Sequence, residues 1–263
     1  MPADLPESLS PGLRRIEIGC RDLDRSLDFY QRLLGFQLLP DAPRPAGRSR
    51  LLSHGTVVLE LVEVGADGNQ GGWVNDDLQG GIRHLGMKVA GVDRQIKRLE
   101  DAGVTVLSQP LDVLGDVRIA FFLDPDGARL EFIQGNLGYQ QISSPELAAA
   151  EAAQVAGDEP RFDHVAVTVA DLPAALGFWR DRFGFEVIGE IRHHGDPGGF
   201  LMTYLQAGPA VLEVFSFDVP IVPNDLSTSG PAVLGPRRLV LDAPGEQQLI
   251  APDGVPVTIG GLR

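Results

Sequence analysis

The chain has 263 residues, of which 43% are hydrophobic, and this is enough for a globular protein of two ordinary domains. Its formal net charge of −14 argues against nucleic acid or an anionic membrane as a partner, because such binding depends on Lys and Arg. The single cysteine excludes an internal disulfide, no apolar run is long enough for a membrane span, and the N-terminal segment gives no indication of secretion. We therefore expect a cytoplasmic protein that acts on a small molecule.

The first predicted unit opens with a strand over residues 15–20 and continues with a helix over residues 22–34. Apolar side chains recur along this helix at helical spacing, and Asp22 or Asp24 can cap it. Three more strands complete a βαβββ unit, near residues 36–39, 48–53 and 56–64.

The second unit repeats this order. A strand over residues 84–89 and a helix from about residue 93 to residue 102 precede strands near residues 104, 117–123 and 130–133. The tight turn Asp124-Pro125-Asp126-Gly127 separates the last two of these strands. We expect one domain over residues 13–134, a linker over 135–160 with a short helix after Ser144-Pro145, and a second domain over 161–263.

The third unit, over residues 162–217, is the clearest copy of the first. Asp171-Leu172 lies 149 residues after Asp22-Leu23, and Phe183-Gly184-Phe185 lies 149 residues after Leu34-Gly35-Phe36. The fourth unit is degenerate, because Asp242-Ala243-Pro244-Gly245 predicts a turn where a helix should start. Only its strands remain.

Each unit opens with a basic residue and usually closes with a glutamate. The separations are 45, 47 and 49 residues in the first three units and 20 in the fourth. The pairs are Arg15 with Glu60, His84 with Glu131, His164 with Glu213, and Arg238 with Thr258. A repeat with one imidazole and one carboxylate per unit predicts a metal site where two complete units face each other.

Several motifs together carry a resemblance to a known family. They are His-x6-Asp-Leu, a Tyr or Trp near Leu-Gly-Phe, and Asp-Pro-Asp-Gly-x3-Glu. The chain resembles the vicinal oxygen chelate superfamily over residues 13–134 and 162–260. This superfamily includes glyoxalase I, methylmalonyl-CoA epimerase, fosfomycin-modifying enzymes, extradiol dioxygenases and bleomycin-binding proteins. The resemblance implies an α+β fold of four βαβββ modules, the last degenerate, paired into two curved mixed-sheet cups.

The resemblance also implies that a metal lies between two paired modules, each supplying its first-strand His and last-strand Glu. Pairing of adjacent modules gives two incomplete sites, of which the first could still hold a metal on Glu60, His84 and Glu131. Crossed pairing of modules two and three gathers all four ligands in one site and leaves the other site with one ligand. We favour it because the loss of one whole site is simpler than the independent loss of ligands from two sites. The predicted ligands are then His84, Glu131, His164 and Glu213. In the other pocket, Arg15 or Arg238 could neutralise Glu60 and leave a buried ion pair or a small anion pocket, and we favour a purely structural role.

Two imidazoles and two carboxylates leave coordination positions open for a substrate on Ni, Co, Mn, Fe or Zn. The resemblance implies a lyase or isomerase acting on a small molecule with vicinal oxygens through a metal-stabilised oxyanion, with Glu131 or Glu213 carrying the proton. A metal-free drug-binding protein is the alternative. An extradiol-dioxygenase-like oxygenase is a third hypothesis, although it needs a His at Arg238 and a Glu at Thr258. Either a monomer or a homodimer is compatible with the sequence.

The remaining candidate residues are assigned structural roles. We expect Cys20 to be a core residue and the unrepeated histidines to face solvent. Among the aromatic residues, those on helices are expected in the core, and the others are candidates to line a substrate cup. The histidines are His54, His193 and His194, the helical aromatics are Tyr30, Phe178 and Trp179, and the cup candidates are Trp73, Phe121 and Phe200.

Overall fold

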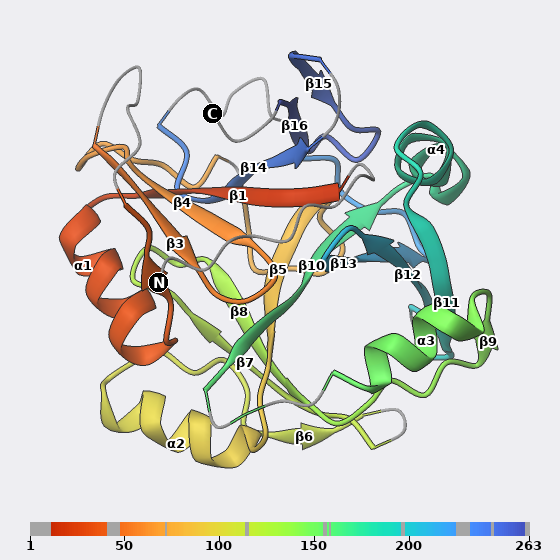
Figure 1. Ribbon diagram of the computed structural model, residues 1–263, viewed down its shortest axis with the longest axis horizontal. Helices are drawn as coiled ribbons and strands as arrows, with labels where there is room; N and C mark the ends of the chain where they lie inside the picture. Colours follow the sequence, from red (N-terminus) through yellow and green to blue (C-terminus); the bar gives the residue numbers. More distant parts are fainter. Residues whose placement is uncertain are drawn as a thin grey trace.

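The computed structural model describes residues 12–40, 48–71, 73–113, 116–154, 157, 159–195, 198–224, 232–242 and 245–260. These residues form two mixed β-sheets with helices around them (Figure 1). The seven-stranded sheet has the order β15-β16-β14-β1-β4-β3-β2, and the nine-stranded sheet has the order β6-β7-β8-β5-β10-β13-β12-β11-β9. This is the predicted α+β architecture of paired modules.

The elements follow the predicted units along the chain. Module one comprises β1 (Gly12–Cys20), α1 (Leu23–Asp28), the π-helix η1 (Phe29–Leu33), β2 (Gln37–Leu38), β3 (Ser49–Ser53) and β4 (Val58–Glu63). Module two comprises β5 (Gly81–Lys88), α2 (Val92–Asp101), β6 (Leu111–Asp112), β7 (Arg118–Leu123) and β8 (Arg129–Gln134).

The connector supplies β9 (Gln141–Ile142) and the predicted helix, α3 (Pro145–Ala152). Module three comprises β10 (Arg161–Val169), α4 (Leu172–Leu176), the π-helix η2 (Gly177–Arg182), β11 (Glu186–His193), β12 (Phe200–Ala207) and β13 (Ala210–Phe217). Module four retains β14 (Gly235–Asp242), β15 (Gln247–Ile250) and β16 (Pro256–Ile259).

The modules pair across the duplication, as favoured from the sequence. Strand β5 pairs antiparallel with β10, with Leu85 opposite Val165, and β1 pairs antiparallel with β14, with Ile16 opposite Leu239. Each half of the chain therefore contributes one module to each sheet. Modules two and three share the nine-stranded sheet, and modules one and four share the seven-stranded sheet.

The helices that follow β1 and β10 begin with the aspartate caps that the sequence indicated, but they change from α-helix to π-helix midway. The Asp22 side chain accepts a hydrogen bond from Arg25 N at 3.0 Å, and Asp171 caps its helix in the same way through Ala174 N. Both helices then continue as π-helices instead of the single α-helix predicted. The largest side chain of each π-helix lies in the core, namely Tyr30 and Trp179, which are 1% and 0% exposed.

A β-bulge interrupts each of the four strands that open the modules. At each bulge the strand pairing skips one residue. In every case this extra residue immediately precedes the basic residue that opens the repeat. A bulge breaks the strict alternation of side chains and re-aims the extra residue. The four bulge residues are Arg14, Arg83, Asp163 and Arg237.

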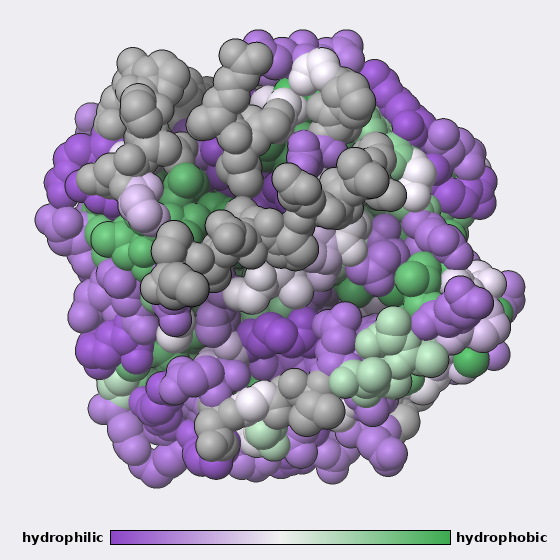
Figure 2. All heavy atoms as spheres, viewed as in Figure 1, coloured by the Kyte–Doolittle hydropathy of each residue, from purple (hydrophilic) through white to green (hydrophobic). Residues whose placement is uncertain are grey.

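Apolar side chains from both sheets form one large buried cluster. The face shown in Figure 2 is mostly hydrophilic over its described part, with apolar residues in separate patches. Among the helices that the structure describes, none has the length and apolar character needed to cross a bilayer.

Candidate metal centre

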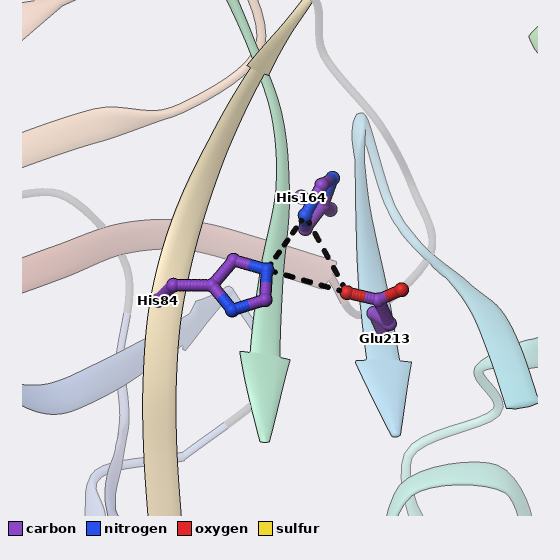
Figure 3. Close-up of side chains that lie close together, drawn as sticks. All are labelled: His84, His164 and Glu213. Atoms are coloured by element: carbon purple, nitrogen blue, oxygen red, sulfur yellow. Dashed lines mark hydrogen bonds and ion pairs between the residues drawn. The ribbon is translucent and has the colours of Figure 1, made fainter. Parts of the chain in front are cut away.

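The four predicted ligands lie on four neighbouring strands of the nine-stranded sheet. Glu131 is on β8, His84 on β5, His164 on β10 and Glu213 on β13. All four side chains are buried, with exposed fractions between 3% and 6%. Figure 3 shows His84, His164 and Glu213 pointing toward one another from their separate strands. Crossed pairing of the modules thus gathers the complete set of two imidazoles and two carboxylates.

The distances between donor atoms match those around a single ion. The two Nε2 atoms are 3.2 Å apart, and Glu213 Oε2 lies 3.4 Å from His84 Nε2 and 3.5 Å from His164 Nε2. Glu131 Oε2 lies 3.5 Å and 3.0 Å from the same two nitrogens. Ligands about 2.1 Å from a common ion are separated by about 3.0 Å at octahedral angles and about 3.4 Å at tetrahedral ones. His84, His164 and Glu213, whose donor atoms all lie within 4.8 Å of one another, therefore fit a divalent metal, and Glu131 contacts both imidazoles of this group.

The charges in the centre also favour a cation. Burial raises the pKa of Glu131, but hydrogen bonds from His164 and His84 outweigh this and hold it at about 2. Burial lowers the pKa of His164, yet Glu213, Asp163 and Glu131 together hold it well above its usual value. Two buried carboxylates that demand a positive charge between them are the environment that a divalent ion satisfies.

Two hydrogen-bonded partners of the ligands were not identified from the sequence. Asp163 Oδ2 lies 3.1 Å from His164 Nδ1, so the carboxylate orients the ring with Nε2 facing inward. The Tyr204 hydroxyl donates to Glu213 Oε1 at 2.6 Å. Asp163 is the bulge residue of β10 and is adjacent in sequence to the ligand that it contacts. Tyr204 faces Glu213 across the β12–β13 pair, a register that the sequence does not specify.

Gly86 provides the space for one imidazole. It lies opposite His164 in the β5–β10 pair, and a Cβ at this position would be 2.1 Å from His164 Cε1. A side chain there would push the imidazole away from the other ligands. The sequence showed only a glycine between Leu85 and Met87, with no sign of this role.

Aromatic rings form one wall beside His84. Phe121 and Phe215 make edge contacts with the His84 ring at centroid distances of 5.3 and 6.3 Å, and Phe200 packs on Phe215 at 5.5 Å. Two of the predicted cup residues, Phe121 and Phe200, thus belong to this aromatic group. Trp73 instead stacks under the Arg83 guanidinium, 5.2 Å from its ring centroid.

The second pocket, between modules one and four, contains an ion pair in place of a ligand set. Arg15 Nε lies 3.2 Å from Glu60 Oε2, and their side chains are 22% and 10% exposed. Arg238 donates to Thr258 Oγ1 at 3.1 Å and lies 3.6 Å from Glu17 Oε2. The expected neutralisation of Glu60 by Arg15 is confirmed.

Of the other single residues, one prediction is wrong. His54 is half-buried against Phe36, at 4.7 Å between ring centroids, and burial followed by repulsion from Arg161 lowers its pKa to about 4. It was expected to face solvent, but the ring that it packs against lies 18 positions earlier, so no local pattern indicates the contact. His193 and His194 are exposed. Cys20 is buried, and this burial raises its pKa to about 11, as expected for a core thiol.

Comparison with known proteins gives consistent matches. The model of the Glyoxalase/Bleomycin resistance protein/Dioxygenase superfamily matches residues 12–132 and 161–226. Lactoylglutathione lyase of Neisseria meningitidis serogroup A is 31% identical over 131 residues, which cover 46% of this chain and 89% of that protein. Lactoylglutathione lyase of Schizosaccharomyces pombe is 25% identical over 76% of this chain and 67% of its own. The crystal structure of glyoxalase I from Zea mays superimposes with a TM-score of 0.69 at 17% identity, covering 95% of this chain and 92% of that one.

Proposed function

This chain belongs to the Glyoxalase/Bleomycin resistance protein/Dioxygenase superfamily, and from this membership we propose that it is a metal-dependent lyase or isomerase of the glyoxalase or epimerase type. The observation that carries the proposal is a buried set of two imidazoles and two carboxylates, in which each carboxylate lies 3.0–3.5 Å from both imidazole Nε2 atoms and these two nitrogens are 3.2 Å apart. Its substrate would be a small molecule with neighbouring oxygen atoms. The names of the lactoylglutathione lyases that it resembles support the same reaction class.

In this proposal His84, His164, Glu131 and Glu213 hold one divalent ion of Ni, Co, Mn, Fe or Zn. When bound, such an ion acts as a Lewis acid that stabilises negative charge on a substrate oxygen. The protein positions the ligands. Asp163 fixes the His164 ring, and Gly86 leaves room for it.

The two carboxylates differ in how firmly they are held. Glu213 Oε2 faces the two imidazoles, and its other oxygen, Oε1, accepts a hydrogen bond from the Tyr204 hydroxyl on the neighbouring strand. Both oxygens of Glu213 are therefore held in place. Glu131 is in contact with the two imidazoles, which approach only its Oε2. We therefore assign the transfer of the substrate proton to Glu131 and a fixed, positioning role to Glu213.

The chain's aromatic wall supports a substrate with an apolar part. Phe121, Phe200 and Phe215 stand on the His84 side of the centre, where they exclude water from the reacting atoms. The acidic ligands and this wall together favour a substrate that brings two oxygens to the ion and a less polar body to the rings.

Elemental analysis of tag-free protein purified without chelator tests the metal first. We expect about one equivalent of a transition metal in the wild type. His84→Ala and His164→Ala should each abolish it, because both imidazoles serve one ion. If His164→Ala keeps its metal, the shared centre is wrong.

Activity is then screened with lactoylglutathione, other 1,2-dicarbonyl adducts and epimerisable acids. Glu131→Gln is expected to lower kcat by at least about 100-fold, because the amide cannot accept the proton. Metal content of this variant serves as the control that the centre is still assembled. Metal retained by the wild type with no turnover on any of these substrates would favour a binding protein instead.

A further inference from the structure

A second cavity, lined by arginines, lies between the two sheets. Its volume is about 210 Å³, enough for several water molecules or one small anion with its contacts. The walls come from the loop around Trp73, the start of β5, the turn before β8, Asn224, the start of β14 and the turn before β16. None of the four candidate metal ligands lines it. Four guanidinium groups do: Arg83, Arg129, Arg237 and Arg238.

Arg83 is the most informative of these side chains. It is 2% exposed, and its hydrogen bonds go to two neutral acceptors, Gln79 Oε1 at 3.3 Å and Val74 O at 2.9 Å. Its Nε is buried without a hydrogen-bond partner, and in the described part of the chain Asp77 and Asp76 favour its charge only from beyond ion-pair distance. Burying a cation whose direct partners are all neutral is costly, so a lining arginine of this kind points to a missing anion.

The neighbouring arginines extend the same pattern. Arg129 pairs with Asp77 at 2.5 Å, but its buried Nε also has no hydrogen-bond partner. Arg238 uses one terminal nitrogen on Thr258, and its Nε makes no hydrogen bond but lies 3.6 Å from Glu17 Oε2. Three arginines with incompletely used N–H groups therefore line one cavity, where a planar fork suits a carboxylate or phosphate.

The β-bulges explain how these side chains reach the same place. Arg83 is the bulge residue of β5, and Arg237 is the bulge residue of β14 at the equivalent position of its module. Because β5 and β14 lie in different sheets, the two bulges direct side chains from both sheets to the gap between them. The repeat that forms the metal centre thus also forms this basic cavity.

We propose that the cavity between β5 and β14 binds a small oxyanion, a phosphate or a carboxylate, at a site separate from the metal centre. Arg83, Arg129 and Arg238 are its principal donors. Trp73, under the Arg83 guanidinium, and Ile82 give the cavity an apolar side that suits a short carbon skeleton. One wall is shared with the metal centre, since the Arg129 guanidinium lies 4.0 Å from the centroid of Phe121, the ring that contacts His84.

Calorimetric titration of the full chain with inorganic phosphate, and separately with malonate, tests the site. Ionic strength is held constant with NaCl, and each titration is run on metal-loaded and on chelator-treated protein. We expect saturable binding of about one equivalent that does not depend on the metal. The tighter of the two anions identifies the ligand as a phosphate or a carboxylate. Binding that disappears after chelation would place the anion on the metal and overturn the proposal.

Arg83→Met should weaken binding by about tenfold or more, because it removes a charge-assisted donor while keeping an unbranched apolar stem. Arg83→Lys keeps the positive charge but lacks the planar guanidinium, so its affinity for the anion should lie between those of the wild type and Arg83→Met. Arg32→Met is the matched control, since Arg32 pairs with Asp28 on the exposed surface. If Arg83→Met does not fold, Arg129→Met gives the same test. Wild-type affinity in the cavity variants, or no saturable binding by the wild type, would refute the site.

Discussion

At the scale of single residues, the candidate ligands could be predicted and their supports could not. His84, Glu131, His164 and Glu213 recur at matching positions of a repeat, so the sequence alone singled them out. Tyr204, Asp163 and Gly86 act through cross-strand register and a bulge, which have no local signature.

Removal of the Tyr204 hydroxyl tests how much these supports contribute. Tyr204→Phe leaves Glu213 Oε1 without its 2.6 Å donor, so we expect metal affinity to fall by roughly 10- to 100-fold. Competition with a metal-sensitive dye measures this change. Tyr139→Phe is the matched control, because Tyr139 packs on Tyr204 but its hydroxyl bonds Glu151. Equal losses in the two variants would assign the effect to packing.

Gly86→Ala should act on the other side of the centre. The added Cβ would meet the His164 ring at 2.1 Å, and the opposing strand cannot easily withdraw. We expect the variant to fold with a lower melting temperature and to lose most of its bound metal. Gly177→Ala is the control, because a Cβ there meets no atom within 4 Å. Full metal occupancy in Gly86→Ala would show that the His164 position is not restricted in this way.

The pair in the second pocket is expected to stabilise the fold. Arg15→Met removes the cation 3.2 Å from the largely buried Glu60 carboxylate and should reduce the free energy of unfolding by about 1–3 kcal/mol. Adding Glu60→Gln should recover part of the loss. Chemical denaturation of both single variants and the double variant measures the coupling. A coupling near zero, like that expected for exposed Arg32 and Asp28, would mean that the pair contributes nothing.

At the scale of elements, the βαβββ order was predictable because caps and apolar spacing are local properties. Asp22, Asp171 and the Asp-Pro-Asp-Gly turn all lie where the sequence placed them. The division of both long helices into α and π segments was not predicted, because it depends on how Tyr30 and Trp179 pack into the core. The strand expected near residue 104 is wrong, because only Val106 forms an isolated bridge there and the strand of this module is β6 at residues 111–112. The short strands β6 and β9 were missed, since the two residues of each are exposed and lack alternation.

The turns of modules two and four contain aspartates that titrate near neutrality. Burial raises the pKa of Asp253 from 3.8 to about 6, although the Val255 amide donates to it at 3.1 Å. The folded state therefore binds this proton more tightly than the unfolded state. The stabilisation is full below about pH 4 and is lost as the pH rises through about 6.

Asp253→Asn keeps the acceptor for the Val255 amide and removes the titration. From pH 7 to pH 4, the stability of the wild type relative to this variant should increase by up to about 3 kcal/mol. Urea denaturation of both proteins across this range isolates the single group. A difference that does not change with pH would show that Asp253 titrates at its ordinary value.

At the scale of the whole molecule, crossed pairing makes the two halves interdependent. The sheets join the halves through β5 with β10 and through β1 with β14, whereas the connector adds only β9 and α3. The chain can be divided into two co-expressed fragments at a point between residues 153 and 160. These fragments should therefore copurify through size exclusion and bind metal. Either fragment alone lacks two of the four ligands and should bind none tightly. Fragments that separate would show that the covalent connector holds the halves together.

Crossed pairing also sets how the centre should respond to dilution. A site built at the contact between separate subunits dissociates at low concentration, whereas both contributors here are tethered in one polypeptide. Specific activity should thus stay constant from micromolar to nanomolar protein. The same tether allows the second pocket to diverge freely, because a single gene can alter one pseudo-equivalent site without altering the other.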